Sequence, residues 1–294
     1  MNQKKAYLYG LTSVILWSTV ASAFKLSLKY FSPLQLLFYS VATSVIILFL
    51  IILKDKKLSL FLTYSKNDYL KLSLLGILNP FLYYLVLFKA YDLLPAQEAQ
   101  PINYTWALTL SYLSFFILRH KLSIYDFLAG IICYLGILVI STHGDLLGFK
   151  FSSLQGVVLA FSSTILWAFY WIFNTKSKVD AVIGLFVSFL FGFILIVLYT
   201  IIFSHTIIFN IYGLLGSIYV GFFEMGITYV FWLKAMKLTT NSSKIANLIF
   251  ISPFVSLIFI HFIVGEKILV STFVGLILIV AGLLIQRKKP AKTL

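Results

Sequence analysis

The sequence predicts an all-α integral membrane protein whose ten transmembrane helices form two inverted repeats of five helices each. Three observations carry this prediction: an apolar composition, a series of charge-free apolar runs, and an internal repeat. The 294 residues have a mean hydropathy of +1.01 and include 29 Phe and 18 Tyr. Such values lie far outside the usage of soluble proteins, so a chain that crosses the membrane several times is expected.

The apolar runs locate the expected helices in order. A hydrocarbon core about 30 Å thick needs roughly 20 apolar residues per helix. Runs of this kind cover residues 6–24, 30–53, 72–88, 99–118, 127–141, 151–175, 181–203, 211–233, 245–264 and 268–286. Strands of a membrane barrel would instead alternate apolar and polar residues over about 10 positions. These runs do not alternate, so helices are expected.

The basic residues predict the orientation of the chain. If the amino terminus is cytoplasmic, 18 of the 23 Lys and Arg residues lie on the cytoplasmic side, where short loops usually carry this excess. The five on the outer side are Lys25, Lys29, Lys89, Lys150 and Lys267. We therefore expect a multi-pass protein of the cell inner (plasma) membrane with both termini cytoplasmic. The net charge of +14 reflects this topology, and no nucleic-acid partner is expected.

An internal repeat divides the chain into two halves, residues 1–148 and 149–294. ILWST (15–19) recurs as ILWAF (165–169), and NPFLYYLVLFKA (79–90) matches EMGITYVFWLKA (224–235) at an offset of 145. The same offset pairs Tyr84 with Tyr229 and Gly130 with Gly275. Because each half has an odd number of expected spans, the second must be inserted upside down. Inverted repeats are common in secondary transporters, where equivalent halves can exchange roles.

Several short motifs then suggest a family. They are LW in the first and sixth segments, KA at the end of the third and eighth, Ser252-Pro253, GEK at 265–267, and glycines late in the fifth and tenth segments. With these marks over nearly the whole chain, the sequence resembles the drug/metabolite transporter (DMT) superfamily in its EamA-type form of two EamA repeats. INYTWAL (102–108) is similar to the NYLWP stretch of the branch with aromatic amino-acid and methyl-viologen exporters, although Ala107 replaces its usual proline.

The resemblance implies a secondary transporter, and more narrowly an exporter, of small organic metabolites such as amino acids or related amphiphilic compounds. Efflux of multiple drugs or quaternary cations is the alternative. The expected partners are a small-molecule substrate and the lipid bilayer, with a homodimer left open. No cofactor or metal is expected, and the single cysteine, Cys133, allows neither an intramolecular disulfide nor a cysteine-based metal site.

The alternatives to a transporter are an intramembrane enzyme and a sensor. An intramembrane enzyme would need a nucleophile with a base, or a metal cluster. The nine acidic residues are scattered and the four histidines form no HExxH motif, so no catalytic residue is predicted. A sensor would need an output domain, and the sequence between the apolar segments supplies none.

Segment 99–118 and its entry carry two polar stripes at about 100° per residue. One contains Gln100, Asn103, Ala107, Ser111 and Ser114, and the nearly opposite one contains Glu98, Thr105 and Thr109. Two polar faces leave little surface for lipid, so this helix is expected inside the bundle, with one stripe against a neighbour and the other facing a cavity. Pro101 is a candidate hinge near its outer end.

Glu224 is the most isolated charge, thirteen residues into its segment. A charge near the bilayer centre costs at least about 2.5 kcal/mol. It is therefore interpreted either as a pathway or proton-coupling residue, or as a buried acid that holds helices together. Its repeat partner is Asn79. Glu98 is a second coupling candidate, or simply an acid favoured at a helix start by the helix dipole.

The predicted site combines these acids with amide side chains and with aromatic side chains deep in the apolar segments. The substrate pathway is predicted to include Trp17, Asn79, Tyr83, Gln100, Asn103, Trp106, Trp167, Glu224, Tyr229 and Asn247, with Glu224 and Glu98 as candidates for proton coupling and no metal ligand. Aromatic rings with a few amides and one acid suit flat or apolar metabolites. Trp171 and Trp232, near segment ends, are interpreted as membrane-interface residues.

Overall fold

Helices make up the molecule. The computed structural model describes residues 2–119, 122–148, 150–174, 177–203, 206–239, 245 and 248–286, and no β-strand occurs among them. Seven helical segments of this part are long and apolar enough to cross a membrane. They are α1 (Gln3–Leu28), α2 (Pro33–Lys54), α3 (Lys66–Gly76) with η2 (Ile77–Leu82) and α4 (Tyr83–Leu93), α7 (Ile124–Ser141), α8 (Leu154–Asn174), α9 (Ala181–Ile202), and α10 (Ile211–Tyr219) with η3 (Val220–Ile227) and α11 (Thr228–Leu238).

The other expected segments are shorter or interrupted. Thr105 separates α5 (Ala96–Tyr104) from α6 (Trp106–Leu118), so the helix expected over residues 99–118 is not continuous. Three short elements follow one another in η4 (Leu248–Ile251), α13 (Ser252–Phe259) and η5 (Ile260–Val264), and α14 (Val270–Gln286) is the last helix. A further turn, η1 (Leu58–Thr63), connects α2 to α3. The predicted all-α class is confirmed.

Local sequence signals set several helix starts. Ser32 and Gln35 satisfy each other's backbone N–H groups at the start of α2, and Ser65 with Asp68 does the same for α3. Asp180 caps α9 through the N–H groups of Val182 and Ile183. Burial alone would raise the pKa of Asp180, but its 2.8 Å ion pair with Lys57 and these hydrogen bonds hold the pKa below its ordinary value.

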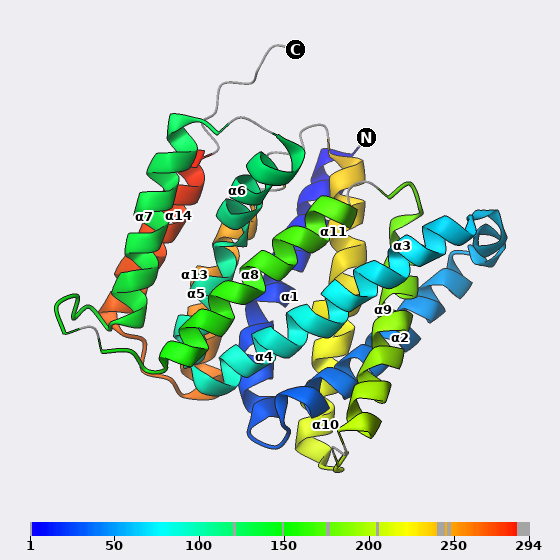
Figure 1. Cartoon of the computed structure of the whole chain (residues 1–294), viewed down its shortest axis with the longest axis horizontal. Helices are drawn as coiled ribbons and strands as arrows, with labels where there is room; N and C mark the ends of the chain where they lie inside the picture. The colour runs from blue at the N-terminus through cyan, green and yellow to red at the C-terminus, as the bar shows by residue number, and fades with distance from the viewer. Residues whose placement is uncertain are drawn as a thin grey trace.

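Helices of the two halves pack against each other in pairs. The most extensive contact joins α7 to α14, followed by α1 with α11, α4 with α8, and α2 with both α9 and η3. Figure 1 shows α7 beside α14 at one edge of the molecule, whereas α2 and α9 lie towards the other. The first turn of α1 and the last turn of α14 lie at the same end of the bundle (Figure 1).

The helix interruptions recur at the offset of the sequence repeat. Shifting η2 by 145 residues places it over positions 222–227, inside the π-helical η3, and the same shift moves Thr105 to position 250, inside η4. The helix pairs show the same repeat. In the two halves α1 corresponds to α8 and α4 to α11, and the contact of α1 with α11 has its counterpart in the contact of α8 with α4. In η2, Asn79 leaves helical geometry (φ −143°, ψ 115°) and precedes a cis peptide bond to Pro80.

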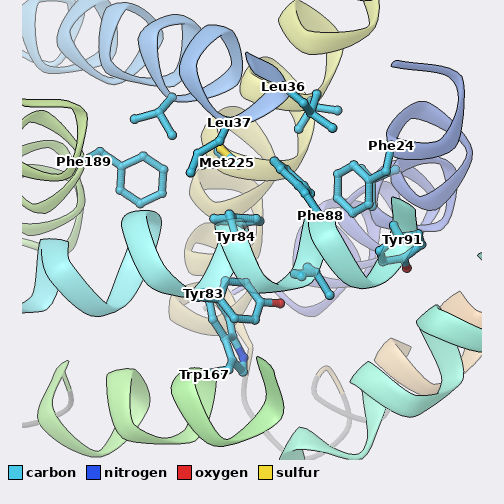
Figure 2. Packing of buried hydrophobic residues seen from close by; sticks show 14 of the residues in the cluster. Phe24, Leu36, Leu37, Tyr83, Tyr84, Phe88, Tyr91, Trp167, Phe189 and Met225 are labelled. Atoms are coloured by element: carbon cyan, nitrogen blue, oxygen red, sulfur yellow. The ribbon is translucent and has the colours of Figure 1, made fainter. Parts of the chain in front are cut away.

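Helix α4 is buried on two sides. Figure 2 shows Tyr84 and Phe88 on the side of α4 that faces Leu36 and Leu37 of α2, whereas Tyr83 points the other way, towards Trp167 of α8. The rings of Tyr83 and Trp167 lie with centroids 4.6 Å apart. Helix α4 therefore separates a packed apolar core from the space between α4 and α8.

The α7–α14 contact predicts a stability difference between two glycine substitutions. A Cβ atom at Gly136 would lie 2.6 Å from the carbonyl oxygen of Gly275, so Gly136→Ala must push the two helices apart. We expect a destabilisation of about 1–3 kcal/mol, seen as a lower unfolding temperature of the purified protein. The control is Gly184→Ala, whose Cβ would meet Leu72 at an ordinary 3.4 Å. Equal unfolding temperatures for the two variants would contradict this packing.

Candidate functional site

A cavity of about 470 Å³ lies inside the bundle. Helices α1, α4, α5, α6, α8 and α11 supply most of its wall, so both halves of the chain contribute. Twelve of its 29 lining residues are aromatic, and they include all five tryptophans of the chain. The wall is thus dominated by flat, weakly polar surfaces that suit an organic molecule.

The two ends of the cavity differ in exposure. At one end the wall reaches the connection between α8 and α9, where Ser177 is exposed. At the other end the lining residues Phe24, Leu87 and Tyr91 are buried, with at most 3% of their surface exposed. The cavity is therefore open beside Ser177 and closed near the ends of α1 and α4.

Glu224 is the one ionisable acid or base, apart from tyrosine hydroxyls, among the described lining residues. It belongs to the π-helical η3, and its Oε1 atom accepts a 3.1 Å hydrogen bond from the hydroxyl of Tyr84. Tyr84 is fully buried on the core side of α4. One carboxylate oxygen is thereby fixed by the core, while the carboxylate remains part of the cavity wall.

Helix α5 contributes two amides. The Nδ2 atom of Asn103 donates to Ser163 of α8 at 2.9 Å, and its Oδ1 atom lies 3.5 Å from the hydroxyl of Tyr83. Gln100 is 3% exposed, and its Oε1 atom has no hydrogen-bond partner in the described part of the chain. A buried acceptor without a partner is costly, so this oxygen is available to a donor on a bound molecule.

Three tryptophan side chains lie close together in the wall of the cavity. The indole rings of Trp106 and Trp171 are nearly parallel, with an interplanar angle of 15° and centroids 6.4 Å apart. Trp167 stands nearly perpendicular to both, at 82° and 83°. Its ring also contacts Tyr229, which packs edge-on against Trp17 at 5.6 Å. Aromatic side chains therefore line the cavity from α6 and α8 across to α1.

The second polar stripe of the α5–α6 segment makes contacts outside the cavity. Glu98 is 1% exposed, and its Oε1 atom lies 2.8 Å from both the Ser152 hydroxyl and His143 Nε2. Thr109 shares a 2.9 Å hydrogen bond with Thr164 of α8. The predicted division of this helix into a cavity face and a packing face is thus seen in its contacts, but its break falls at Thr105, four residues after Pro101.

The structure brings most of the predicted pathway residues together. Those in the cavity wall are Trp17, Tyr83, Gln100, Asn103, Trp106, Trp167, Glu224 and Tyr229. Asn79 is buried in η2 and Glu98 is buried near the closed end, and neither belongs to the wall. Asn247 lies outside the described residues.

Sequence reasoning missed several aromatic lining residues. Trp171 and Trp232 were expected at the membrane interface, yet both belong to the cavity wall. Their spacing carries a signal for this, because Trp171 follows Trp167 by four residues and Trp232 follows Tyr229 by three, which places each pair on one helix face. Tyr91, Tyr104 and Tyr170 also line the cavity.

A bundle of apolar helices around an internal cavity is the architecture of a membrane transporter. The model of the EamA-like transporter family matches residues 4–142 and again 154–286. The chain belongs to the EamA-like transporter family and is a transporter rather than an enzyme.

Individual relatives agree with this membership. An uncharacterized transporter of Clostridium kluyveri is 26% identical over 295 residues, covering 96% of this chain and 93% of the relative. An uncharacterized transporter of Archaeoglobus fulgidus is 24% identical, covering 98% and 99%. A solved structure described as "Crystal structure of protein" has the same fold, with a TM-score of 0.68 at 21% identity over 98% of this chain and 100% of the other.

The cavity and its open end predict a pattern of chemical labelling. Cys133 is buried, so a Cys133→Ala background allows single cysteines to be introduced elsewhere. We expect Ala107→Cys, in the cavity wall, to react with a water-soluble methanethiosulfonate when vesicles expose the Ser177 end, and to react far more slowly from the opposite side. The control is Ile194→Cys, 47% exposed in the middle of the apolar helix α9, where lipid is expected to cover it. Equal labelling of both cysteines would contradict the assignment.

Proposed function

We propose that the protein is a secondary transporter of small organic molecules that works by alternating access between two halves. The observation that carries the proposal is the central cavity itself: both halves line it, and it is open at one end and closed at the other. Ten spans arranged as two inverted five-helix repeats are part of the proposal. The recurrence of the helix interruptions at the 145-residue offset supports that arrangement, because equivalent halves can open one site to each side in turn.

We further propose the orientation of the molecule and the direction of transport. The start of α1 and the end of α14 lie at one end of the bundle (Figure 1), which supports two termini on the same side of the membrane. The excess of basic residues on that side supports a cytoplasmic location for both termini, in a protein of the inner membrane. The open end beside Ser177 is then cytoplasmic, and the structure is an inward-facing state. Such a state admits a solute from the cytoplasm, as an exporter requires.

Two substrate classes are compatible with an aromatic cavity of this size. Amino acids or related amphiphilic metabolites are the first, and cationic drugs or quaternary cations are the second. Both have apolar surface for the aromatic wall and polar groups for the amides of Gln100 and Asn103. The two classes differ in the net charge of the solute.

The substrate pathway can be tested by flux measurements. In proteoliposomes screened with amino acids, nucleosides and quaternary amines, we expect saturable transport of one class. Because Asn103 and Trp106 form the wall of the cavity, Asn103→Ala or Trp106→Ala should reduce that transport at least about tenfold. Phe116→Ala, on the outward face of α6, serves as the control and should transport normally. Undiminished flux in both cavity variants would show that the substrate does not pass through this cavity.

Glu224 is proposed as the residue that couples transport to a proton gradient, because its carboxylate lies in the cavity wall and no other acid does among the described residues. Glu224→Gln keeps the shape and a hydrogen bond from Tyr84 but cannot bind and release a proton. We expect it to abolish transport driven by a pH gradient while substrate exchange at equal pH continues, as measured by flux in proteoliposomes.

The matched control for coupling is Glu98→Gln. Glu98 is buried outside the cavity, so this variant should retain gradient-driven transport. If Glu98→Gln loses gradient-driven transport and Glu224→Gln keeps it, the coupling role passes to Glu98. If both variants keep it, transport is facilitated diffusion or is coupled through another group.

A further inference from the structure

We propose that the connection between α2 and α3 binds an anionic phospholipid of the surrounding membrane, with lysines around the headgroup and two leucines between the acyl chains. The connection joins the end of α2 at Lys54 to the start of α3 at Lys66 and contains η1 (Leu58–Thr63). It lies outside the wall of the central cavity. The inference therefore concerns a second site and holds whether or not the protein transports a solute.

This connection lies at the level where two membrane-spanning segments end. The first of them is Pro33–Lys54, and the second is Lys66–Leu93. Because a span ends where the chain leaves the hydrocarbon, the short connection between these two must run along the headgroup region. Figure 1 shows the connection at the edge of the bundle opposite α7 and α14, where lipid headgroups can reach it.

The η1 turn has an inner side that packs on the protein and an outer side that does not. On the inner side, Phe61 packs edge-on against Phe186 of α9 with ring centroids 5.9 Å apart, and Leu60 packs against the core. On the outer side, Leu58 is 48% exposed and Leu62 is 91% exposed. Exposed apolar side chains beside basic ones are typical of segments that lie in the membrane interface. We therefore place Leu58 and Leu62 against acyl chains.

The charges of the connection match an anionic headgroup. Residues 54–71 contain five Lys and two Asp. Four of the lysines are exposed and form no ion pair with any residue that the structure describes, namely Lys54, Lys56, Lys66 and Lys71. Asp68 accepts hydrogen bonds from the backbone N–H and the hydroxyl of Ser65 at the start of α3. The four exposed lysines are thus available to a phosphate group at the membrane surface.

The fifth lysine fixes the connection to the second half of the chain. Lys57 forms the 2.8 Å ion pair with Asp180, and the hydroxyl of Tyr64 accepts a 3.1 Å hydrogen bond from the backbone N–H of Asp180. An excess of basic residues on one side of a membrane protein does not by itself create a lipid site. Here the four exposed lysines and the two leucines belong to one structured connection, so a headgroup and its acyl chains can be bound together.

Thermal unfolding of the purified full-length protein tests the site. The protein is held in dodecyl maltoside micelles, and phosphatidylglycerol or phosphatidylcholine with identical acyl chains is added. We expect phosphatidylglycerol to raise the unfolding temperature about 3 °C or more above its value in phosphatidylcholine, because a ligand that binds the folded state stabilises it. Equal unfolding temperatures in the two lipids would overturn the proposal. Inorganic phosphate should have no effect, and an increase as large as that of phosphatidylglycerol would overturn the assignment to a lipid.

Charge variants locate the effect. The combined variant Lys54→Gln, Lys56→Gln, Lys66→Gln and Lys71→Gln should lose at least about half of the difference between the two lipids, whereas Arg at the same positions should keep it. The control replaces four exposed lysines of α1 and α11 with Gln, at Lys4, Lys5, Lys234 and Lys237, and should also keep the difference. An equal loss in both Gln variants would mean that total charge, and not this site, attracts the lipid.

Fluorescence quenching tests the insertion of Leu62 independently of charge. In the Cys133→Ala background, Leu62→Cys is labelled with an environment-sensitive dye and placed in phosphatidylglycerol nanodiscs. We expect lipid with brominated acyl chains to quench this label more strongly than aqueous iodide does. Lys178→Cys, at an exposed position between α8 and α9, is the control and should be quenched more strongly by iodide. Stronger quenching by iodide at position 62 would place this side chain in water and overturn the proposal.

Discussion

The hydrogen bond from Tyr84 to Glu224 connects the packed core of the bundle to its central cavity. A carboxylate at membrane depth needs a partner inside the protein, because hydrocarbon supplies none. Tyr84 supplies it from the packed core across α4, in a helix whose opposite side faces Trp167 (Figure 2). The acid is thereby retained at the cavity although the described lining residues include no Lys, Arg or His, so a substrate or a proton can supply the positive charge. The π-helical η3 that carries Glu224 is also where backbone geometry departs from a regular helix.

The closed end of the cavity is held by polar contacts, some of them between the two halves and some within the first half. Glu266, in the GEK turn, accepts hydrogen bonds from the backbone N–H groups of Ala96 and Gln97 at 2.8 and 3.1 Å and so caps α5. The side chain of Gln97 in turn bonds to the backbone of Lys267 and Leu269. Lys25 donates to the carbonyl oxygens of Tyr91 and Leu94, at the end of α4. Because these bonds link loops and helix ends rather than whole helices, they can break when this end opens, whereas the α7–α14 contact can stay intact.

The sequence predicts most of this fold because hydrophobic runs, Ser and Asp caps and a constant repeat offset are local signals. It also identifies Glu224, Asn103 and the deep tryptophans, since a polar or large aromatic residue inside an apolar run needs a reason. It does not locate the break at Thr105 or the π-helical turns, which depend on packing between distant helices. For the same reason the burial of Glu98 against His143 and Ser152 was not predictable: those partners lie 45 and 54 residues away, in the α7–α8 connection.

Alternating access around the cavity is the central claim, and spin-label distances at its two ends test it most directly. One pair of labels would replace Lys29 and Lys267 near the closed end, and a second pair Lys178 and Lys237 near the open end, all at exposed positions. In lipid nanodiscs, addition of a solute with demonstrated saturable flux should lengthen the first distance while it shortens the second, as measured by double electron–electron resonance. Unchanged distance distributions at both ends, in protein that transports that solute, would contradict the account.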